Sequence, residues 1–116
     1  MKQTYYYKGQ KIRTSEHDYK YALIVEFEGK IYVKKCSSTY QGCETELNRL
    51  TKLFRNCQAK GINFDDARKY WHDCCMASIE RKPFQKDRKF EAVTSGVWSD
   101  QLNHPNKYQI VELEAR

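Results

Sequence analysis

Residues 19–28 constrain the fold more than any other part of the chain. This stretch is rich in tyrosine, isoleucine, valine and phenylalanine, and its centre is apolar at successive positions, as in a strand that is covered on both faces. Glu28-Gly29-Lys30 has the composition of a turn, and Ile31-Tyr32-Val33 begins a second apolar run. The pattern therefore predicts a β-hairpin with a buried first strand.

A basic, tyrosine-rich segment surrounds this hairpin. Seven of the nine tyrosines lie in the first forty residues, which carry eight Lys or Arg against four acids and so hold +4 of the net charge of +6. Gly9 interrupts an extended pattern over residues 5–12 and predicts a turn or bulge there. Strands that present rings and cations together suit a nucleic acid or an anionic protein surface.

Two helices are predicted in the middle of the chain. Ser38 and Gln41 fit a capping box at the start of the first helix, and Gly61 predicts a left-handed stop at its end. Asn63, followed by two aspartates, predicts the start of a second helix that ends near Lys82. The short link predicts an antiparallel helical hairpin. The buried faces are predicted to hold Cys43, Leu47, Leu50, Phe54 and Cys57 in the first helix, and Ala67, Tyr70, Trp71, Cys74, Cys75, Ser78 and Ile79 in the second.

The last third of the chain predicts short strands. Residues 89–94 and 107–114 have strand composition, Val97-Trp98 begins a further short strand, and residues 103–106 form a loop. The predicted order is β-β-β-α-α-β-β, an antiparallel α+β fold with the helical hairpin packed on one face of a sheet. The length of 116 residues predicts a single domain over residues 1–116.

Localisation is inferred from what the sequence lacks. The longest apolar run, residues 21–25, is five residues long, against the roughly 18 that a membrane span needs. The N-terminus has no signal-peptide pattern, and an odd number of cysteines, five, favours reduced thiols. We expect a cytoplasmic protein without a membrane partner.

The cysteines do not predict a metal site. Zinc requires four ligands at about 2.0–2.3 Å from one point. Cys43 and Cys57 are fourteen residues apart on the predicted first helix, which places them about 21 Å apart. The chain has no Cys-x-x-Cys pair. We expect buried core thiols, no metal and no cofactor.

No catalytic motif is present. His72 and Cys75 share a helical face, but Cys75 falls in the predicted apolar stripe, whereas a reactive thiol needs an electropositive and partly exposed site. Gly-x-Ser-x-Gly, His-Glu-x-x-His and a glycine-rich phosphate loop are absent from the sequence. We expect a binding protein rather than an enzyme, and an enzyme with a thiol nucleophile is only the third hypothesis.

Nucleic-acid binding is the positive signal. Tyr5 or Tyr7 would stack on unpaired bases where its ring points outward, at about 1–3 kcal/mol per base. Neighbouring residues in a strand face opposite sides, so at least one of Tyr5, Tyr6 and Tyr7 is expected in the core. The cations predicted to contact phosphates are Lys8, Lys11, Arg13, Lys34 and Lys35.

A protein-binding role is the alternative. Tryptophan is one of the residues that anchor interfaces. Trp98 lies in a polar stretch between Gly96 and Pro105, with little apolar pattern around it. It is therefore the candidate anchor for a protein partner, and packing of its ring over the helices is the competing interpretation.

The N-terminal segment resembles a known class of proteins. Residues 5–15 (Tyr-Tyr-Tyr-Lys-Gly-Gln-Lys-Ile-Arg-Thr-Ser) and Tyr19-Lys20-Tyr21-Ala22 resemble the opening of small orphan proteins of phages and mobile elements in Gram-positive bacteria. The resemblance covers about twenty residues and carries over no functional residue. It implies a setting in which small proteins act on host nucleoprotein machinery, as anti-defence inhibitors do, anti-CRISPR proteins among them.

These observations combine into one functional hypothesis. We expect a non-enzymatic protein that engages nucleic acid, or a nucleic-acid-handling complex, through the basic, tyrosine-rich N-terminal hairpin. The alternative is an anti-CRISPR-like inhibitor that binds a host defence enzyme directly by protein–protein contacts.

Overall fold

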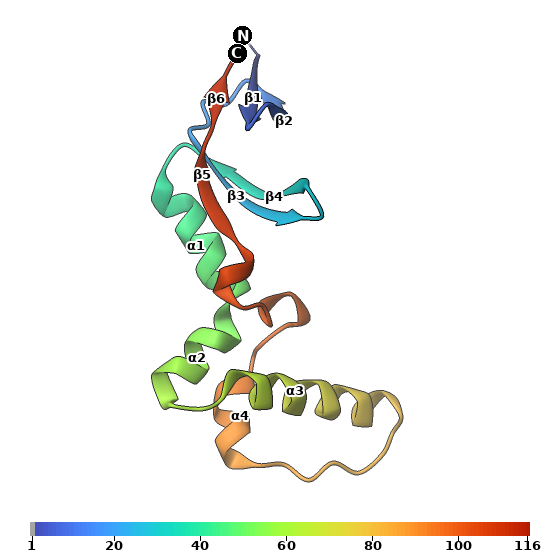
Figure 1. The fold of residues 1–116 in the computed structure, drawn as a ribbon. Helices are drawn as coiled ribbons and strands as arrows, with labels where there is room; N and C mark the ends of the chain where they lie inside the picture. Colours follow the sequence, from blue (N-terminus) through green and yellow to red (C-terminus); the bar gives the residue numbers. More distant parts are fainter. Residues whose placement is uncertain (1) are drawn as a thin grey trace. The chain divides into compact units, whose positions relative to one another are not determined.

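The computed structural model describes residues 2–116 and confirms the α+β class (Figure 1). The chain forms two compact units. Residues 2–49 and 105–116, here the sheet unit, hold two small antiparallel sheets, whereas residues 50–104, here the helical unit, hold three of the helices. That residues 1–116 act as one folding domain stays a prediction.

The first hairpin consists of β1 (Gln3–Tyr7) and β2 (Gln10–Ser15), joined at Lys8-Gly9. Both turn residues have positive φ, 49° and 78°, as a type I′ hairpin turn requires. Glycine at the second position therefore allows the turn that the sequence predicted. The strand β6 (Glu114–Ala115) pairs with the other edge of β1, and the described chain ends lie side by side, because Arg116 N donates to Thr4 O at 2.9 Å (Figure 1).

The second hairpin consists of β3 (Tyr21–Phe27) and β4 (Lys30–Ser37), and it confirms the prediction for residues 19–33. Its turn, Glu28-Gly29, has φ values of 51° and 76°. Four successive residues of β3 are buried, Ala22 to Val25, as a strand covered on both faces must be. The strand β5 (Gln109–Glu112) pairs with β3 on its other edge, so the sheet order is β4-β3-β5.

The two hairpins share one core. Ala22, Ile24 and Cys36 lie on one face of the β4-β3-β5 sheet and form its centre. On the other face the Tyr21 ring meets Tyr40, the first residue of α1 (Tyr40–Leu50), with ring centroids 5.7 Å apart. The core is completed by partly buried side chains from both hairpins and the C-terminal segment: Tyr7, Ile12, Tyr19, Ile31, Val111 and Leu113.

The predicted first helix, residues 38–60, is wrong in two respects. Gly42 N donates to Thr39 Oγ1 at 3.1 Å, so Thr39 caps the helix and the capping box of Ser38 and Gln41 does not form. The helix also stops at Leu50, where Thr51 takes ψ of 26°, and α2 (Lys52–Lys60) follows as a separate helix. A β-branched residue such as Thr51 loses side-chain rotamer freedom in a helix, so the helix is less stable at that position.

The helical unit is built around α2, α3 (Phe64–Ile79) and α4 (Arg88–Thr94), which all contact one another (Figure 1). The predicted end of α2 and the predicted start of α3 are confirmed. Gly61 ends α2 with φ of 66°, and Asn63 Oδ1 accepts a hydrogen bond from Asp66 N at 3.0 Å at the start of α3. The core of the unit comprises Leu53, Cys57, Ala67, Val93 and Val97.

The strand predicted at residues 89–94 is wrong, because this segment is α4. Asp87 Oδ1 accepts from Lys89 N at 2.9 Å and so caps the helix. Phe90, Val93 and Thr94 recur at helical spacing and form the inner face of this helix, although valine and threonine composition favours a strand. Val97-Trp98 forms no strand either, because it enters a 3₁₀ turn, η1 (Ser99–Gln101).

Two further predictions are corrected. The closing strand at 107–114 is found as β5 and β6 after a 3₁₀ turn, η2 (Pro105–Lys107), and the two strands lie in different sheets. Ser78 and Ile79 were expected in the buried face of α3, yet both are exposed, Ile79 at 74%. The nine residues of α2 are too few to cover the sixteen of α3.

Candidate nucleic-acid interface

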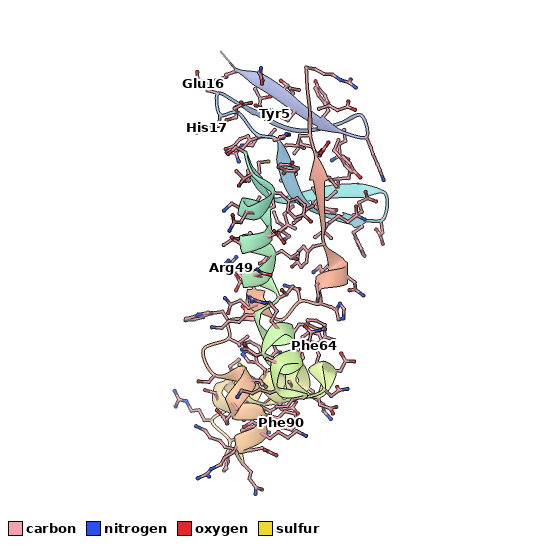
Figure 2. The ribbon with its side chains drawn as sticks, turned by 90° about the vertical axis from the view of Figure 1, so that its left-hand side faces the viewer. Tyr5, Glu16, His17, Arg49, Phe64 and Phe90 are labelled. Atoms are coloured by element: carbon pink, nitrogen blue, oxygen red, sulfur yellow. The ribbon has the colours of Figure 1, made fainter. Side chains whose placement is uncertain are left out.

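The Tyr5 ring is part of the core of the first hairpin. Its side chain is only 1% exposed. The hydroxyl donates to His17 O at 2.7 Å and accepts from Tyr19 N at 3.1 Å. Figure 2 labels Tyr5 and His17 at the same end of the ribbon. The ring of Tyr5 also meets that of Tyr19 edge-on, with centroids 5.8 Å apart. Tyr5 is therefore removed from the predicted stacking residues, and the expectation that one of the three tyrosines lies in the core is confirmed.

Three more of the predicted site residues of the first hairpin contact their own neighbours. Tyr7 is half-buried and packs on the shared core. The Lys8 ammonium lies 5.4 Å from the Tyr7 ring centroid and 3.3 Å from Glu26 Oε1. The hydrogen bond and the charge of Glu26 raise the pKa of Lys8. Arg13 lies over the Tyr19 ring, 5.2 Å from its centroid.

The other predicted cations lie in different places. Lys11 is exposed on β2, opposite Tyr6, and Lys35 is exposed on β4, opposite Leu23. Lys34 is exposed at a bulge of β4, where the register shifts by one residue. The structure therefore does not gather the seven predicted residues into one site, although Lys34 lines a hollow.

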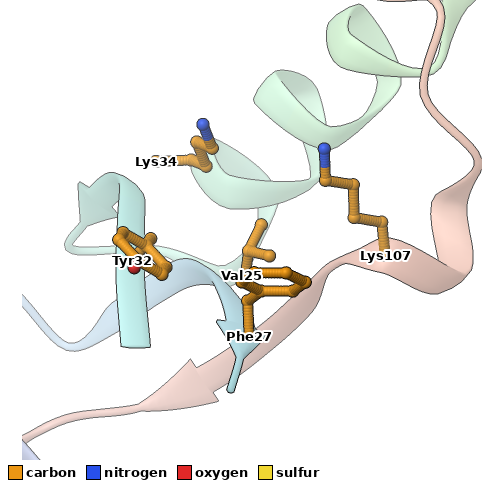
Figure 3. Close-up of a pocket in the computed structure, with 5 residues that line it drawn as sticks. All are labelled: Val25, Phe27, Tyr32, Lys34 and Lys107. Carbon is orange, nitrogen blue, oxygen red and sulfur yellow. The ribbon is translucent and has the colours of Figure 1, made fainter. Parts of the chain in front are cut away.

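This hollow lies on the second hairpin, and we call it the aromatic hollow (Figure 3). It has a volume of about 370 Å³. Phe27 is 60% exposed and Tyr32 is 48% exposed, whereas Val25 is buried beside them. In Figure 3 the ammonium groups of Lys34 and Lys107 both extend beyond the two rings on the same side. Its lining residues are Val25, Phe27, Tyr32, Lys34 and Lys107.

Strand register explains why the two rings share a face. Val25 lies directly opposite Tyr32, and Phe27 lies opposite Lys30. Because side chains alternate along a strand, Val25 and Phe27 face the same side, and Tyr32 joins them there as the diagonal neighbour of Phe27. Diagonal pairs of this kind have Cα atoms about 7–8 Å apart, so both rings can line the same hollow.

The charge around the aromatic hollow is positive. Lys34 forms no ion pair with any residue that the structure describes. Glu26, in the same strand, faces the other side of the sheet and pairs with Lys8. Two exposed rings beside two exposed lysines suit a ligand that carries both flat apolar groups and negative charge.

Sequence reasoning missed Phe27, Tyr32 and Lys107 as members of this site. The signal for the first two was present, since both flank the Gly29 turn at positions that a two-residue hairpin loop places on one face. Lys107 had no such signal, because its position depends on the pairing of β5 with β3, which are more than eighty residues apart.

The five cysteines differ in how deeply they are buried. All are free thiols; Cys36, Cys43 and Cys57 are buried and Cys74 and Cys75 are half-buried. Burial raises the pKa of Cys75, which opposes the thiolate form that a nucleophile needs. Among residues 2–116, no group of three or more His, Cys, Asp or Glu side chains is placed to hold a metal ion.

The helical unit offers two other surface features. Trp98 is 72% exposed on a braced turn, because its backbone N–H donates to Gln101 Oε1 at 2.9 Å. A second hollow of about 390 Å³ lies along α3, where Asp65 and Arg68 form an ion pair at 3.8 Å. The carboxylate of Asp65 offsets the positive charge there, so this hollow is less suited to an anion than the first. The lining residues are Asp65, Arg68, Lys69, His72 and Leu102.

Comparison with protein-family models, with curated proteins and with solved structures found no match. None of the helices in the described part of the chain is both long and apolar enough to span a bilayer. The resemblance to phage and mobile-element proteins stays a prediction.

Proposed function

We propose that this protein binds single-stranded nucleic acid, and that the aromatic hollow is its principal contact surface. The observation that carries the proposal is the pair of exposed rings, Phe27 and Tyr32, on one sheet face beside Lys34 and Lys107. The proposed role is binding without catalysis, and the first hairpin supports the sheet instead of forming the main contact.

The rings favour unpaired bases. A base stacked on an exposed aromatic side chain contributes about 1–3 kcal/mol to binding. Phe27 and Tyr32 already have much of their surface in solvent, so binding a base does not require them to leave a packed core. The bases of a duplex are stacked on one another and are not available to these rings, so a preference for single strands follows.

The lysines favour the phosphates that connect those bases. Lys34 and Lys107 line the aromatic hollow, and Lys30 is exposed opposite Phe27. Each phosphate contact with a single strand contributes about 0.7 to the slope of log affinity against log salt. A backbone that passes beside the two rings would therefore bind with a clear dependence on salt.

A salt series on labelled oligonucleotides tests this function. We expect wild-type protein to bind a single-stranded oligonucleotide more tightly than the matching duplex, with an affinity that falls linearly in log salt. The double variant Phe27→Ala/Tyr32→Ala should lose this preference. Tyr40→Ala is the matched control, because Tyr40 is a 49% exposed ring outside the aromatic hollow. Absence of binding at low salt would refute the proposal.

The biological setting remains part of the proposal. A single-stranded nucleic acid, free or within a nucleoprotein complex, is the partner that the aromatic hollow suits best. An origin in a phage or mobile element, and a cytoplasmic location, are the settings in which such a partner would be met.

A second candidate function is supported by Trp98. Its exposed ring on a braced turn is the geometry of an interface anchor, and Val97 O accepts a hydrogen bond from Trp71 Nε1 at 2.9 Å that fixes the turn. The corresponding role is inhibition of a host enzyme by direct contact. Trp98→Ala should abolish binding to such an enzyme and leave oligonucleotide affinity unchanged.

A further inference from the structure

The link from α3 to α4, taken together with the first two residues of α4, carries the highest density of cations in the described chain. Residues 81–89, here the basic segment, hold five Lys or Arg and one acid. The acid, Asp87, is used to cap α4, since its Oδ1 accepts from Lys89 N at 2.9 Å. All five cations are exposed: Arg81, Lys82, Lys86, Arg88 and Lys89.

Tyr70 of α3 holds the basic segment in place. Its ring centroid lies 5.2 Å from that of Phe84 and 5.1 Å from that of Phe90. Its hydroxyl accepts from Asp87 N at 3.1 Å and donates to Glu91 Oε1 at 2.8 Å. The segment is therefore tied down in its middle and at its end, and an ordered array of cations loses less entropy when it binds a ligand.

Arg81 occupies a backbone conformation that disfavours a side chain. It follows the end of α3 with φ of 55°, and the adjacent turn is closed by a hydrogen bond from Lys82 N to Ala77 O at 2.8 Å. Glycine or asparagine is the usual residue at such a position. A left-handed arginine costs free energy, and strain of this kind is concentrated at functional sites.

The carboxylates around the basic segment do not neutralise it. Glu80 pairs with Lys82 at 2.9 Å, and Glu91 accepts from Tyr70. Within residues 2–116 the remaining four cations of the segment form no ion pair. Phe84 and Phe90 are occupied in packing with Tyr70, so the segment presents charge without a free ring.

We infer that the basic segment is a second contact surface for nucleic acid, which binds the phosphate backbone and does not read bases. The inference rests on the proposed function, because it assigns the helical unit a share in binding the same ligand. A strand of phosphates is the ligand that supplies repeated negative charge to such an array of cations. Since the segment offers no ring to an unpaired base, it contributes to the binding of duplexes as well as single strands, through their phosphates.

A matched pair of double variants tests the inference. Arg81→Gly/Lys86→Gln removes two positive charges from the basic segment, and Lys60→Gln/Lys69→Gln removes two exposed charges elsewhere in the helical unit. We expect the first variant to reduce the slope of log affinity against log salt by about 1.4 on a single strand and about 1.8 on a duplex. The control should leave both slopes unchanged. Glycine tolerates the conformation of residue 81, so the thermal midpoint should not fall.

The outcomes separate this inference from the proposed function. Equal slopes of log affinity against log salt for the two double variants would overturn the inference. They would not affect the proposal that the aromatic hollow binds single strands. Loss of affinity in Arg81→Gly/Lys86→Gln, with none in Phe27→Ala/Tyr32→Ala, would support the inference and refute the aromatic hollow. Binding to phosphatidylserine vesicles that the first variant loses, at an unchanged oligonucleotide slope, would overturn the inference in favour of an anionic membrane surface near the exposed Ile79.

Discussion

The two hairpins of the sheet unit have similar composition but use their aromatic rings differently. Both turn through two residues of positive φ, and both carry tyrosines beside lysines. In the first hairpin Tyr5 is 1% exposed and Lys8 is paired with Glu26. In the second, Phe27 is 60% exposed, and Phe27 and Lys34 both line the aromatic hollow. Similar residues therefore form a core in one hairpin and a surface in the other.

The difference arises from what each hairpin packs against. Tyr7 and Ile12 of the first hairpin pack on the core of Ala22, Ile24 and Cys36, so its rings complete that core. The tip of the second hairpin extends to Phe27 without such a partner among the described residues. A cluster of rings and cations thus marks a binding surface only where the rings are left uncovered.

The largest expected effect is on stability and separates the two hairpins directly. Tyr5→Ala should lower the free energy of unfolding by about 3–5 kcal/mol, because it removes a buried ring and leaves a cavity. Phe27→Ala should change that free energy by less than about 0.5 kcal/mol, since its ring is largely exposed. Urea unfolding followed by circular dichroism measures both. Similar losses in the two variants would mean that the hairpins do not differ as described.

The next effect concerns binding. Phe27→Ala and Tyr32→Ala should each weaken binding to a single-stranded oligonucleotide by about 1–3 kcal/mol, or about 5-fold to 150-fold in dissociation constant. The triple variant Lys8→Gln/Lys11→Gln/Arg13→Gln of the first hairpin should cost less than either. Fluorescence anisotropy at fixed salt measures the dissociation constants. A larger loss of affinity in the triple variant would indicate that the first hairpin is the main contact.

A smaller effect distinguishes the lysines. Lys34→Gln should reduce the salt slope for a single strand by about 0.7, the value for one phosphate contact. Lys8→Gln should leave that slope almost unchanged, because Glu26 already pairs with the ammonium of Lys8. Dissociation constants at four or more salt concentrations provide the slopes. A reduction of equal size in both variants would contradict the assignment of Lys34 to the aromatic hollow.

The smallest effect is a pH dependence of the core that joins the hairpins. Burial raises the pKa of Cys36 above its usual value of 9.0, and the nearby Arg13 opposes this only partly. The folded state therefore retains the thiol proton after the unfolded state has lost it. The resulting stability is complete below pH 9 and is lost as pH rises through the higher folded pKa. Cys36→Ala should show a shallower fall in thermal midpoint between pH 8.5 and pH 10 than wild type.

Local signals in the sequence predicted the local structure well. Gly29 and the apolar residues before it specified the second hairpin, and Gly61 and Asn63 specified the ends of two helices. The error at residues 89–94 arose because amino-acid composition and helical spacing indicate different structures there. Val93 and Thr94 favour a strand by composition, yet the Asp87 cap and the helical spacing of the apolar residues determine α4.

The candidate site was less predictable because it depends on contacts between distant segments. Lys34 was expected from its charge, and it does line the aromatic hollow. Tyr5 was expected for its ring, but burial beneath residues 17–19 removes it from the surface. Lys107 enters only through the pairing of β5 with β3, which no local pattern encodes.

An NMR titration of the labelled protein with a single-stranded oligonucleotide shows which hairpin contacts the ligand. Backbone amide shifts assign contacts to one hairpin or the other without any mutation. We expect the largest shift changes at residues 25–27, 32–34 and 107, with small changes over residues 3–15. Changes confined to residues 3–15, or none at a saturating oligonucleotide concentration, would show that the aromatic hollow is not the contact surface.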